Sequence, residues 1–227
     1  MSTNQRREFL RNAAVTLTGV TAATAVAASV SAQDVAAKKR NVIGINTSHR
    51  TGKTCADALK IVLENVTLAD PNLETELIEL APLNIGIPVV GAEQPKDDLD
   101  EILTKISAPN CIGLVLATPV YFGLPSTRCV ALIDRLMPIK RTWGLRNKIF
   151  GGVVVGAARN GGQETLLHAL ANSMLTQQMI LAVDSAPTSH WGATLWSQKD
   201  SIAEDESGQN TAKNLGKRIA ELAAFVQ

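Results

Sequence analysis

Residues 112–117 read Ile-Gly-Leu-Val-Leu-Ala, an uninterrupted apolar run that ends at Thr118 and Pro119. A strand that is apolar on both faces is typical of a parallel sheet with helices packed on both sides. Two further runs of this kind, 41–46 and 149–155, lie before and after it in the chain. The sequence therefore predicts a parallel sheet that contains these three buried strands.

Shorter strands and amphipathic stretches fill the rest of the chain. Residues 73–80 alternate between apolar and polar like a strand near a sheet edge, and 180–183 form a last short strand. Helical spacing of apolar residues predicts five helices, over 55–66, 99–106, 125–137, 166–174 and 215–226, and the third carries its apolar face on Val130, Ile133, Leu136 and Met137. Five strands that alternate with five helices predict one three-layer α/β domain.

The first 32 residues differ in composition from the rest. Arg6 and Arg7 precede an Ala-, Thr- and Val-rich stretch over 13–30, and small residues at 30–32 suit a signal peptidase. The pattern resembles a twin-arginine export signal, with a retained membrane anchor as the alternative. We expect a signal peptide over 1–32, a linker over 33–40, one domain over 41–227, and export to the periplasm by the twin-arginine (Tat) machinery.

Composition narrows the function classes. The 227 residues are 45% hydrophobic, which is enough for one full core. The formal charge is +1, and it becomes −1 when residues 1–32, with three arginines and one glutamate, are removed. No basic stripe is present, so nucleic acid is not an expected partner. Three well-separated cysteines form no CxxC pair, and we expect buried thiols rather than a metal site.

Ligands of open parallel sheets bind beyond the carboxyl ends of the strands, which directs attention to three loops. The first, 46–54, reads Asn-Thr-Ser-His-Arg-Thr-Gly-Lys-Thr. Its hydroxyls, cations and glycine precede a predicted helix N-terminus, a combination that suits a phosphate dianion. One alternative is a nucleotide P-loop, although Thr47 stands where that motif needs its first glycine. Another is a polar capping loop that binds nothing.

The second loop, 118–123, reads Thr-Pro-Val-Tyr-Phe-Gly and places two adjacent aromatic residues at the mouth of a buried strand. They can flank a flat ring, or form a hydrophobic plug on the next helix. The third loop, 156–163, supplies glycines that let a ligand approach the backbone. Together, a loop suited to phosphate, a pair of aromatic side chains and a glycine-containing loop at one sheet edge suit a mononucleotide with a planar ring system. FMN is the candidate.

Four segments, 48–54, 118–123, 133–135 and 159–164, together resemble the NADPH-dependent FMN reductase and iron–sulfur flavoprotein branch of the flavodoxin-like proteins. The resemblance covers about residues 41–195 and implies a flavodoxin-like five-stranded parallel sheet of order 2-1-3-4-5. Iron–sulfur members carry a compact cysteine cluster before the second helix. Residues 83–91 contain no cysteine here, so this chain resembles a clusterless member without a metal site.

The resemblance implies that the first loop binds the FMN phosphate, the second lies along the isoalloxazine ring and the third closes over its pyrimidine end. The implied cofactor contacts are Thr47, Ser48, His49, Arg50, Thr51, Gly52, Lys53, Thr54, Thr118, Pro119, Val120, Tyr121, Phe122, Gly123, Gly156, Arg159, Asn160, Gly161 and Gly162. Residues 190–193 resemble the family's aromatic-glycine stretch near the flavin.

FMN would carry the redox chemistry, so we assign no catalytic acid or base to the protein. The expected activity is an FMN-dependent NAD(P)H/quinone-type reductase that transfers electrons or hydride from a small donor to a small acceptor such as a quinone. Because nicotinamide coenzymes are not expected at useful levels outside the inner membrane, the donor stays open. The alternatives are a flavodoxin-style electron carrier for a protein partner and a flavin-free binding domain.

The remaining expectations concern assembly and the histidines. We expect a homo-oligomer, either a dimer or a tetramer. His49 is a candidate for contact with phosphate and His190 for lining an acceptor pocket, whereas His168 is expected to be solvated or to cap a helix.

Overall fold

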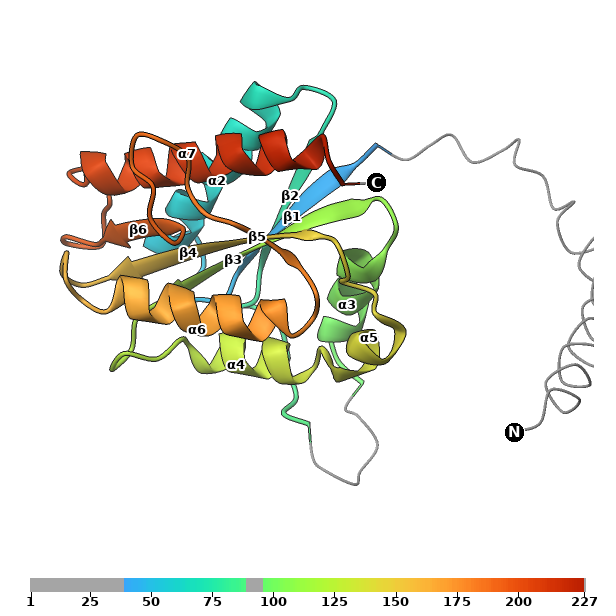
Figure 1. Cartoon of the computed structure of the whole chain (residues 1–227). Helices are drawn as coiled ribbons and strands as arrows, with labels where there is room; N and C mark the ends of the chain where they lie inside the picture. Colours follow the sequence, from blue (N-terminus) through green and yellow to red (C-terminus); the bar gives the residue numbers. More distant parts are fainter. Residues whose placement is uncertain (1–38, 89–95, 227) are drawn as a thin grey trace, which may run out of the picture. The chain divides into compact units, whose positions relative to one another are not determined.

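The computed structural model describes residues 39–88 and 96–226 (Figure 1). The strands are β1 (Asn41–Asn46), β2 (Glu74–Glu79), β3 (Cys111–Pro119), β4 (Ile149–Gly156), β5 (Ile180–Ala182) and β6 (Ala193–Trp196). The helices are α2 (Thr54–Ala69), α3 (Leu99–Ser107), α4 (Thr127–Asp134), α5 (Met137–Thr142), α6 (Gln163–Leu175) and α7 (Glu206–Ala223). None of these helices is long and apolar enough to span a bilayer. The predicted signal peptide lies outside the described residues.

The strands form one parallel sheet of order β2-β1-β3-β4-β5, which confirms the predicted fold class and strand order. The prediction of five strands is wrong in one respect, because β6 also pairs with β4. The strand β5 pairs with the first half of β4 and β6 with the second half, from Val153 to Gly156. The fifth position of the sheet is thus filled by two short parallel strands.

The segment 183–192 between β5 and β6 explains why this strand is split. Pro187 has no backbone N–H for a sheet ladder. The buried carboxylate of Asp184 accepts hydrogen bonds from the His190 N–H and the Thr188 hydroxyl. These bonds hold the two ends of the segment close together. The chain therefore leaves the sheet after β5 and returns two residues further along β4.

Helices cover both faces of the sheet, with α2 and α7 on one face and α3, α4, α5 and α6 on the other (Figure 1). The central strand β3 supplies side chains to both layers: Val115 packs with the α2 and α7 side, and Leu114 and Leu116 with the opposite side. Gly216 lets α7 approach α2, because a Cβ there would lie 2.4 Å from the Val62 carbonyl oxygen. The apolar run that predicts a central strand is thus buried from both sides.

The three cysteines are buried free thiols, as predicted. Burial raises the pKa of Cys55 to about 12, with Arg50 opposing the shift. The pKa of Cys129 is also raised to about 12 by burial. These thiols are therefore part of the apolar core.

The predicted apolar face of the third helix is wrong at Val130 and Met137 only, since Ile133 packs against the core and Leu136 is buried. Val130 and Met137 are 44% and 56% exposed, whereas Leu132 and Leu136 are buried. The helix ends at Asp134, and a short second helix, α5, starts at Met137 with a proline in its first turn. The cause is the residue between the two helices, Arg135, which is itself only 2% exposed.

Arg135 forms a buried ion pair that ties three segments together. Its Nη1 lies 2.6 Å from Asp97 Oδ2 and its Nη2 lies 2.9 Å from Asp100 Oδ1. Asp97 also accepts hydrogen bonds from the backbone N–H groups of Gly86 (2.6 Å) and Leu99 (3.0 Å). Burial alone would raise the pKa of Asp97, but the bonds from Arg135 and these two N–H groups together hold that pKa below its ordinary value. The pair fixes the loop after β2 against α3 and α4.

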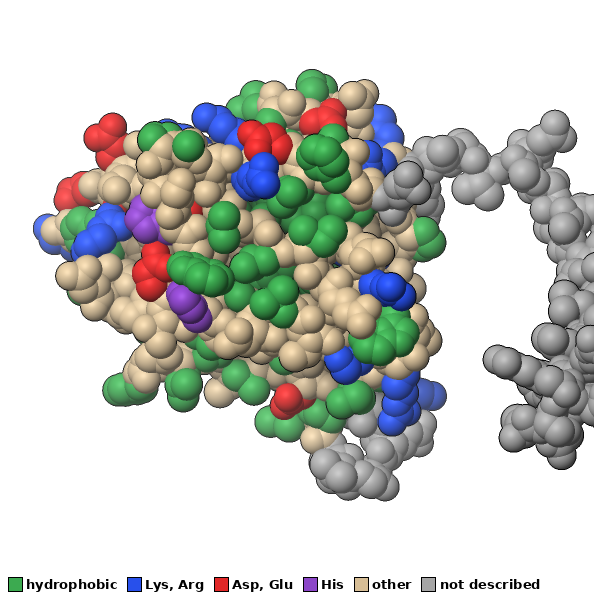
Figure 2. Space-filling model, viewed as in Figure 1, with side chains coloured by type: hydrophobic (Ala, Val, Ile, Leu, Met, Phe, Trp, Pro, Cys, Tyr) green, Lys and Arg blue, Asp and Glu red, His purple; other side chains and the backbone are tan. Residues whose placement is uncertain are grey.

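On the face seen in Figure 2, acidic and basic side chains are interspersed, and apolar side chains gather between α6 and α7, where β5 runs. Exposed apolar residues in and beside β5 include Ile180 and Val183, which are 38% and 37% exposed, and Trp191, which is 43% exposed. The free edge of the sheet is therefore an apolar strip bordered by mixed charge.

Replacing Asp97 with Asn should destabilise the protein by about 3–5 kcal/mol at pH 7, because it leaves the buried Arg135 without its main counter-charge. Chemical denaturation measures the change. Since the pKa of Asp97 is lowered by folding, its stabilising effect is present above about pH 4 and is lost as the pH falls. The difference between wild type and variant should therefore shrink in acid.

Asp57→Asn is the matched control, because Asp57 pairs with Lys60 at 3.2 Å on the exposed side of α2. That change should cost well under about 1 kcal/mol. Equal losses in the two variants would show that the Arg135 pair does not hold the fold.

Candidate functional site

The three loops singled out in the sequence follow β1, β3 and β4, which are neighbours in the sheet. The chain continues from β1 to β2 on one side and reaches β3 on the other, so the β1–β3 boundary is the topological switch point. The His49 and Tyr121 rings stack with centroids 6.0 Å apart. A Cβ on Gly162 would lie 3.7 Å from Val120 Cγ1. All three loops therefore meet at the carboxyl edge of the sheet.

The first loop is anchored at its start. The backbone N–H and the hydroxyl of Thr47 both donate to the Ala117 carbonyl, at 2.8 and 2.9 Å. The Asn46 side-chain oxygen accepts from the Ser48 N–H (3.0 Å), and the Ser48 hydroxyl oxygen accepts from the Arg50 N–H (3.2 Å). Thr47 and Ser48 are buried. Thr47 and Ser48 therefore fix the backbone of the loop on its buried side.

A set of hydrogen-bond donors without partners lies in and under this loop. The N-cap of α2, Lys53, makes no side-chain capping bond, so the first-turn N–H groups of the helix lack that partner. The Thr54 hydroxyl has no partner among residues 39–88 and 96–226. The buried Nδ2 of Asn46, beneath the loop, likewise has none in that part of the chain. An oxyanion satisfies such a set, so these residues fit the phosphate of FMN.

Two carboxylates that the sequence prediction did not include, Asp200 and Glu79, interact with groups of the first loop. Arg50 Nη1 lies 2.6 Å from Asp200 Oδ1, and Lys53 Nζ lies 4.0 Å from Asp200 Oδ2. The hydrogen bond to Asp200 raises the pKa of Arg50 above its ordinary value and lowers that of Asp200. Glu79 accepts from the Gly52 N–H at 3.0 Å. Because the Arg50–Asp200 pair is half-exposed and therefore weak, a phosphate dianion can compete with Asp200 for Arg50.

The second loop forms a small hairpin. Tyr121 and Leu124 exchange two backbone hydrogen bonds of 2.9 Å, and the two residues between them, Phe122 and Gly123, have φ of 53° and 78°. Two left-handed residues in this place are typical of a tight hairpin turn. The side chain of Phe122 is fully exposed and that of Tyr121 is 41% exposed. The alternative of an aromatic plug on the next helix is wrong, because Phe122 lies in solvent and the half-exposed Tyr121 stacks on His49.

Thr118, Pro119 and Val120 hold this hairpin on the sheet. The Thr118 hydroxyl oxygen accepts from the Ser126 N–H at 3.1 Å, and Thr118 is buried. Pro119 is the last residue of β3, and the Val120 N–H donates to the Val155 carbonyl at 3.0 Å. Thr118 therefore supports the hairpin from within the protein, whereas Pro119 and Val120 are half-buried at its base. Together these residues position the exposed aromatic pair.

The third loop is organised by a buried residue, Gln163. Its Nε2 donates to the carbonyls of Ala158 (2.6 Å) and Leu195 (3.0 Å), and its Oε1 accepts from the Gly161 N–H (2.8 Å). A Cβ on Gly156 would lie 2.5 Å from Gln163 Nε2, which explains the glycine there. Gln163 thus holds the loop in one shape beside the second loop.

Arg159 does not join the other predicted contacts. Its guanidinium forms an ion pair with Asp205, the N-cap of α7, and its Nη1 lies 3.4 Å from the Thr194 carbonyl. It therefore points toward the start of α7. Asn160 is exposed at the tip of the loop.

The histidines behave differently from one another. His49 Nε2 lies 3.3 Å from the Thr127 hydroxyl, close to the first and second loops. His190 Nδ1 lies 3.4 Å from Asp184 Oδ2. His168 is exposed, as predicted, and its ring contacts Trp191 with centroids 4.0 Å apart. The contacts of His190 and Trp191 are thus made within 183–192 and with α6, away from the three loops.

The sequence prediction did not include five residues that build the site: Asn46, Glu79, Ser126, Gln163 and Asp200. Ser126 was recognised only as the start of a helix, which is the position of an N-cap. Asn46 follows directly after a buried strand, a place where polar side chains reach the carboxyl edge. Nothing in the local pattern marks Glu79, Gln163 or Asp200. Within the described ranges, no cluster of three or more His, Cys, Asp or Glu side chains is arranged for a metal ion.

Comparisons with known proteins agree with this geometry. The sequence model of the family described as NADPH-dependent FMN reductase matches residues 40–191. An iron–sulfur flavoprotein of Methanocaldococcus jannaschii is 37% identical over 195 residues, which cover 82% of this chain and 98% of that protein. An iron–sulfur flavoprotein of Methanosarcina thermophila is 29% identical over 198 residues, covering 82% and 96%.

A solved structure supports the fold alone. The flavodoxin, WrbA-like protein from Agrobacterium tumefaciens superposes with a TM-score of 0.58 at 17% identity, covering 83% of this chain and 99% of that chain. The shared architecture is the parallel sheet of order β2-β1-β3-β4-β5 with helices on both faces.

Replacing Thr54 with Val removes the free hydroxyl and keeps the shape of the side chain. We expect FMN affinity to fall about tenfold, since a charge-assisted hydrogen bond contributes about 1.5–3 kcal/mol. Flavin fluorescence titration measures the affinity, and inorganic phosphate should compete with FMN less well in the variant. Thr67→Val is the matched control, because Thr67 lies on the same helix and its hydroxyl donates to the Glu64 carbonyl at 3.0 Å. If both variants bind like wild type, the loop is only a helix cap.

Proposed function

The chain belongs to the NADPH-dependent FMN reductase family, and from this premise we propose that it passes electrons through bound FMN to a small acceptor of the quinone type. FMN is the cofactor and oxidoreduction is the chemistry of the family. Membership favours the FMN phosphate over a nucleotide P-loop as the interpretation of the first loop. The acceptor class is our proposal.

The exposed aromatic hairpin is the observation that carries the proposal. Tyr121 and Phe122 are exposed beside the first loop, 46–54. His49 of that loop contacts the hairpin by stacking on Tyr121. A planar ring that lies along this hairpin keeps one face open to solvent. Small molecules can reach such a face without a lid or a long channel. A quinone, which is itself planar and apolar, suits a surface made of aromatic rings.

FMN, when bound, supplies the redox chemistry, and the protein supplies binding and orientation. Asn46, Thr54 and the first turn of α2 would hold the phosphate, with Arg50 released from Asp200 as an additional donor. The hairpin would orient the ring, and Gly162, whose φ is +97°, leaves space where the third loop approaches. No side chain of these loops is required to move a proton.

An electron carrier for a protein partner is the second candidate, and one observation favours it. Phe122 is fully exposed and Leu124 is 65% exposed, so the hairpin presents an apolar tip. Such a tip can dock on another protein as well as bind a small acceptor. Turnover with a range of small quinones supports the enzyme, whereas selective exchange with one protein partner supports the carrier.

We also propose a homo-oligomeric assembly and export to the periplasm. The apolar strip along β5 supports the first, because exposed apolar patches of this kind mark interaction surfaces. The paired arginines and the weakly apolar stretch that follows them support the second. Export favours a quinol or a reduced protein over NADPH as the donor.

The purified protein should be yellow, with one FMN per chain by its absorption spectrum, and should reduce quinones when FMN is reduced. Phe122→Ala should slow quinone reduction by about tenfold, because it removes about 1.5 kcal/mol of contact with the ring, and should leave the phosphate-dependent part of FMN affinity intact. Phe225→Ala is the matched control, since Phe225 is 83% exposed at the end of the chain. A colourless, folded protein that takes up no added FMN would contradict the proposal.

Replacing both Arg6 and Arg7 with Lys should retain the protein in the cytoplasm, because the twin-arginine route requires the paired guanidinium groups. Cell fractionation followed by immunoblotting measures the distribution. A Lys38, Lys39 double substitution to Arg, which lies after the predicted cleavage site, serves as the control. Normal delivery of the Arg6, Arg7 variant to the periplasm would reject this route.

A further inference from the structure

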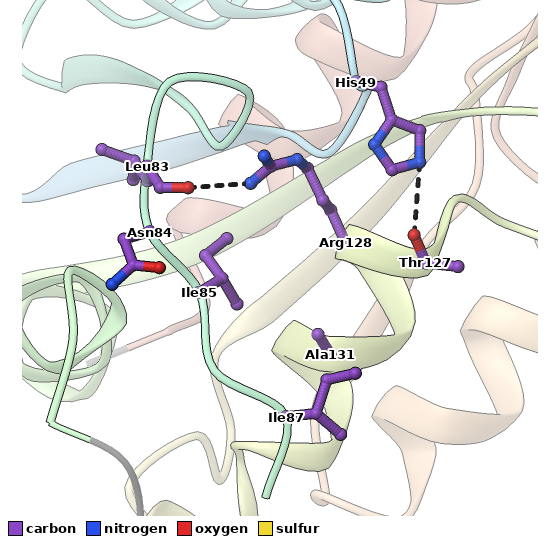
Figure 3. A pocket seen from close by; sticks show the side chains of 8 residues that line it. All are labelled: His49, Leu83, Asn84, Ile85, Ile87, Thr127, Arg128 and Ala131. Carbon is purple, nitrogen blue, oxygen red and sulfur yellow. Dashed lines mark hydrogen bonds between the residues drawn. The ribbon is translucent and has the colours of Figure 1, made fainter.

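A second pocket lies next to the first loop, and His49 is the one residue of the three loops that lines it. It has a volume of about 280 Å³ and is bounded by the segment 83–87 after β2 and by the first turns of α4. Figure 3 shows the side chains of Ile85 and Ile87 opposite Ala131, with Arg128 and His49 at the upper end. We name it the 83–87 pocket.

The pocket combines one permanent cation with an aliphatic wall. Arg128 Nη1 donates to the carbonyls of Leu80 (2.6 Å) and Leu83 (3.0 Å), which fixes the guanidinium in place. Its Nε and Nη2 have no hydrogen-bond acceptor in the described part of the chain. Leu83, Ile85 and Ile87 line the opposite side, and none of the described residues that line the pocket is acidic.

The wall of the pocket is held in place by buried interactions rather than left as a loose loop. Asp97, fixed by the buried Arg135, accepts from the Gly86 N–H at 2.6 Å. Asp98 accepts from the Asn84 N–H at 2.8 Å. The segment is therefore fixed at two points, and the pocket is formed before any ligand binds. Preorganisation of this kind lowers the entropic cost of binding.

We propose that the 83–87 pocket binds a small organic monoanion, namely a carboxylate with an apolar body of one or two rings. The carboxylate pairs with the free edge of the Arg128 guanidinium, and the body lies against Ile85, Ile87 and Ala131. One fixed guanidinium matches one carboxylate, since this pairing is planar and bidentate. A volume of about 280 Å³ is at the lower end of small-molecule sites, which limits the ligand to this size.

The start of α4 favours the same charge. Ser126 caps the helix through the Cys129 N–H at 3.1 Å, and Thr127 and Arg128 follow in its first turn. The positive end of the helix dipole therefore adds to the charge of Arg128. The inference does not depend on the proposed function, because Arg128, Ile85, Ile87 and Ala131, which would bind the carboxylate, neither hold the FMN phosphate nor lie in the aromatic hairpin. His49 alone is shared with the FMN loops.

The test is a calorimetric titration of the protein as purified, FMN included, with 2-naphthoate. We expect saturable binding of one molecule per chain. The neutral 2-naphthamide, which keeps the rings and loses the charge, should bind about tenfold more weakly or worse, because it forfeits the charge-assisted bonds. Acetate, which keeps the charge and loses the body, should bind more weakly as well.

Two variants separate the pocket from the rest of the surface. Arg128→Gln should weaken 2-naphthoate about tenfold or more, with partial recovery in Arg128→Lys. Ala131→Leu keeps the cation and the helix but fills the pocket, and should abolish binding, which keeps the test decisive if Arg128→Gln folds poorly. Arg141→Gln is the matched control, since Arg141 is an exposed arginine on α5 outside the pocket.

Three results would overturn the proposal. They are the absence of saturable binding to wild type, equal binding to Ala131→Leu and wild type, and competition by inorganic phosphate with release of FMN, which would place the anion on the phosphate loop. The flavin absorption spectrum, recorded during the titration, reports FMN separately. A failure of the proposed function and a failure of this inference are therefore distinguishable.

Discussion

A buried hydrogen-bond network at the ends of β1 and β3 holds the parts of the site in register. Thr47 donates twice to the Ala117 carbonyl, the Ser126 hydroxyl donates to the Thr47 carbonyl at 2.6 Å, and the Ser126 N–H donates to Thr118 Oγ1. All four residues are buried. The network fixes the position of the loop 46–54 above the sheet, the direction in which the chain leaves β3 toward the aromatic hairpin, and the start of α4. Because no member can leave without stranding a buried polar partner, these three features are positioned together.

The sheet and its loops were predictable because parallel strands buried on both faces leave long apolar runs, and because their carboxyl ends must share an edge. The failures have a common cause. Val130 and Met137 match a helical apolar face, yet the chain buries Arg135 between them, since a long-range partner, Asp97, compensates its charge. The strand β6 was not predicted, because its pairing depends on where the chain returns to β4 after the segment 183–192. Such long-range partners leave no local pattern in the sequence.

The predicted site residues divide by what their side chains do. Thr47, Ser48 and Thr118 support the loops from within the protein, whereas Tyr121 and Phe122 face solvent. The motif therefore identifies the right loops without separating supporting residues from those that can contact a ligand. Asn46 and Gln163, which do much of the shaping, were missed because a single buried amide is recognisable only from the hydrogen bonds around it. The division follows from burial, and burial depends on tertiary contacts.

Electrostatics at this edge of the sheet differ between the loop 46–54, where we propose that the FMN phosphate binds, and the 83–87 pocket. Around the phosphate loop, Asp200 and Glu79 offset the cations and one N–H group, so that attraction for a phosphate comes mainly from backbone donors, Asn46 and Thr54. Among the described residues that line the 83–87 pocket there is no carboxylate to offset Arg128, whose charge lies beside an apolar wall. The first arrangement suits a dianion that can displace a weak ion pair, and the second suits a monoanion with an apolar body. His49, which contacts Tyr121 and Thr127 and lines the pocket, lies between them, so the two regions differ in chemistry while sharing one side chain.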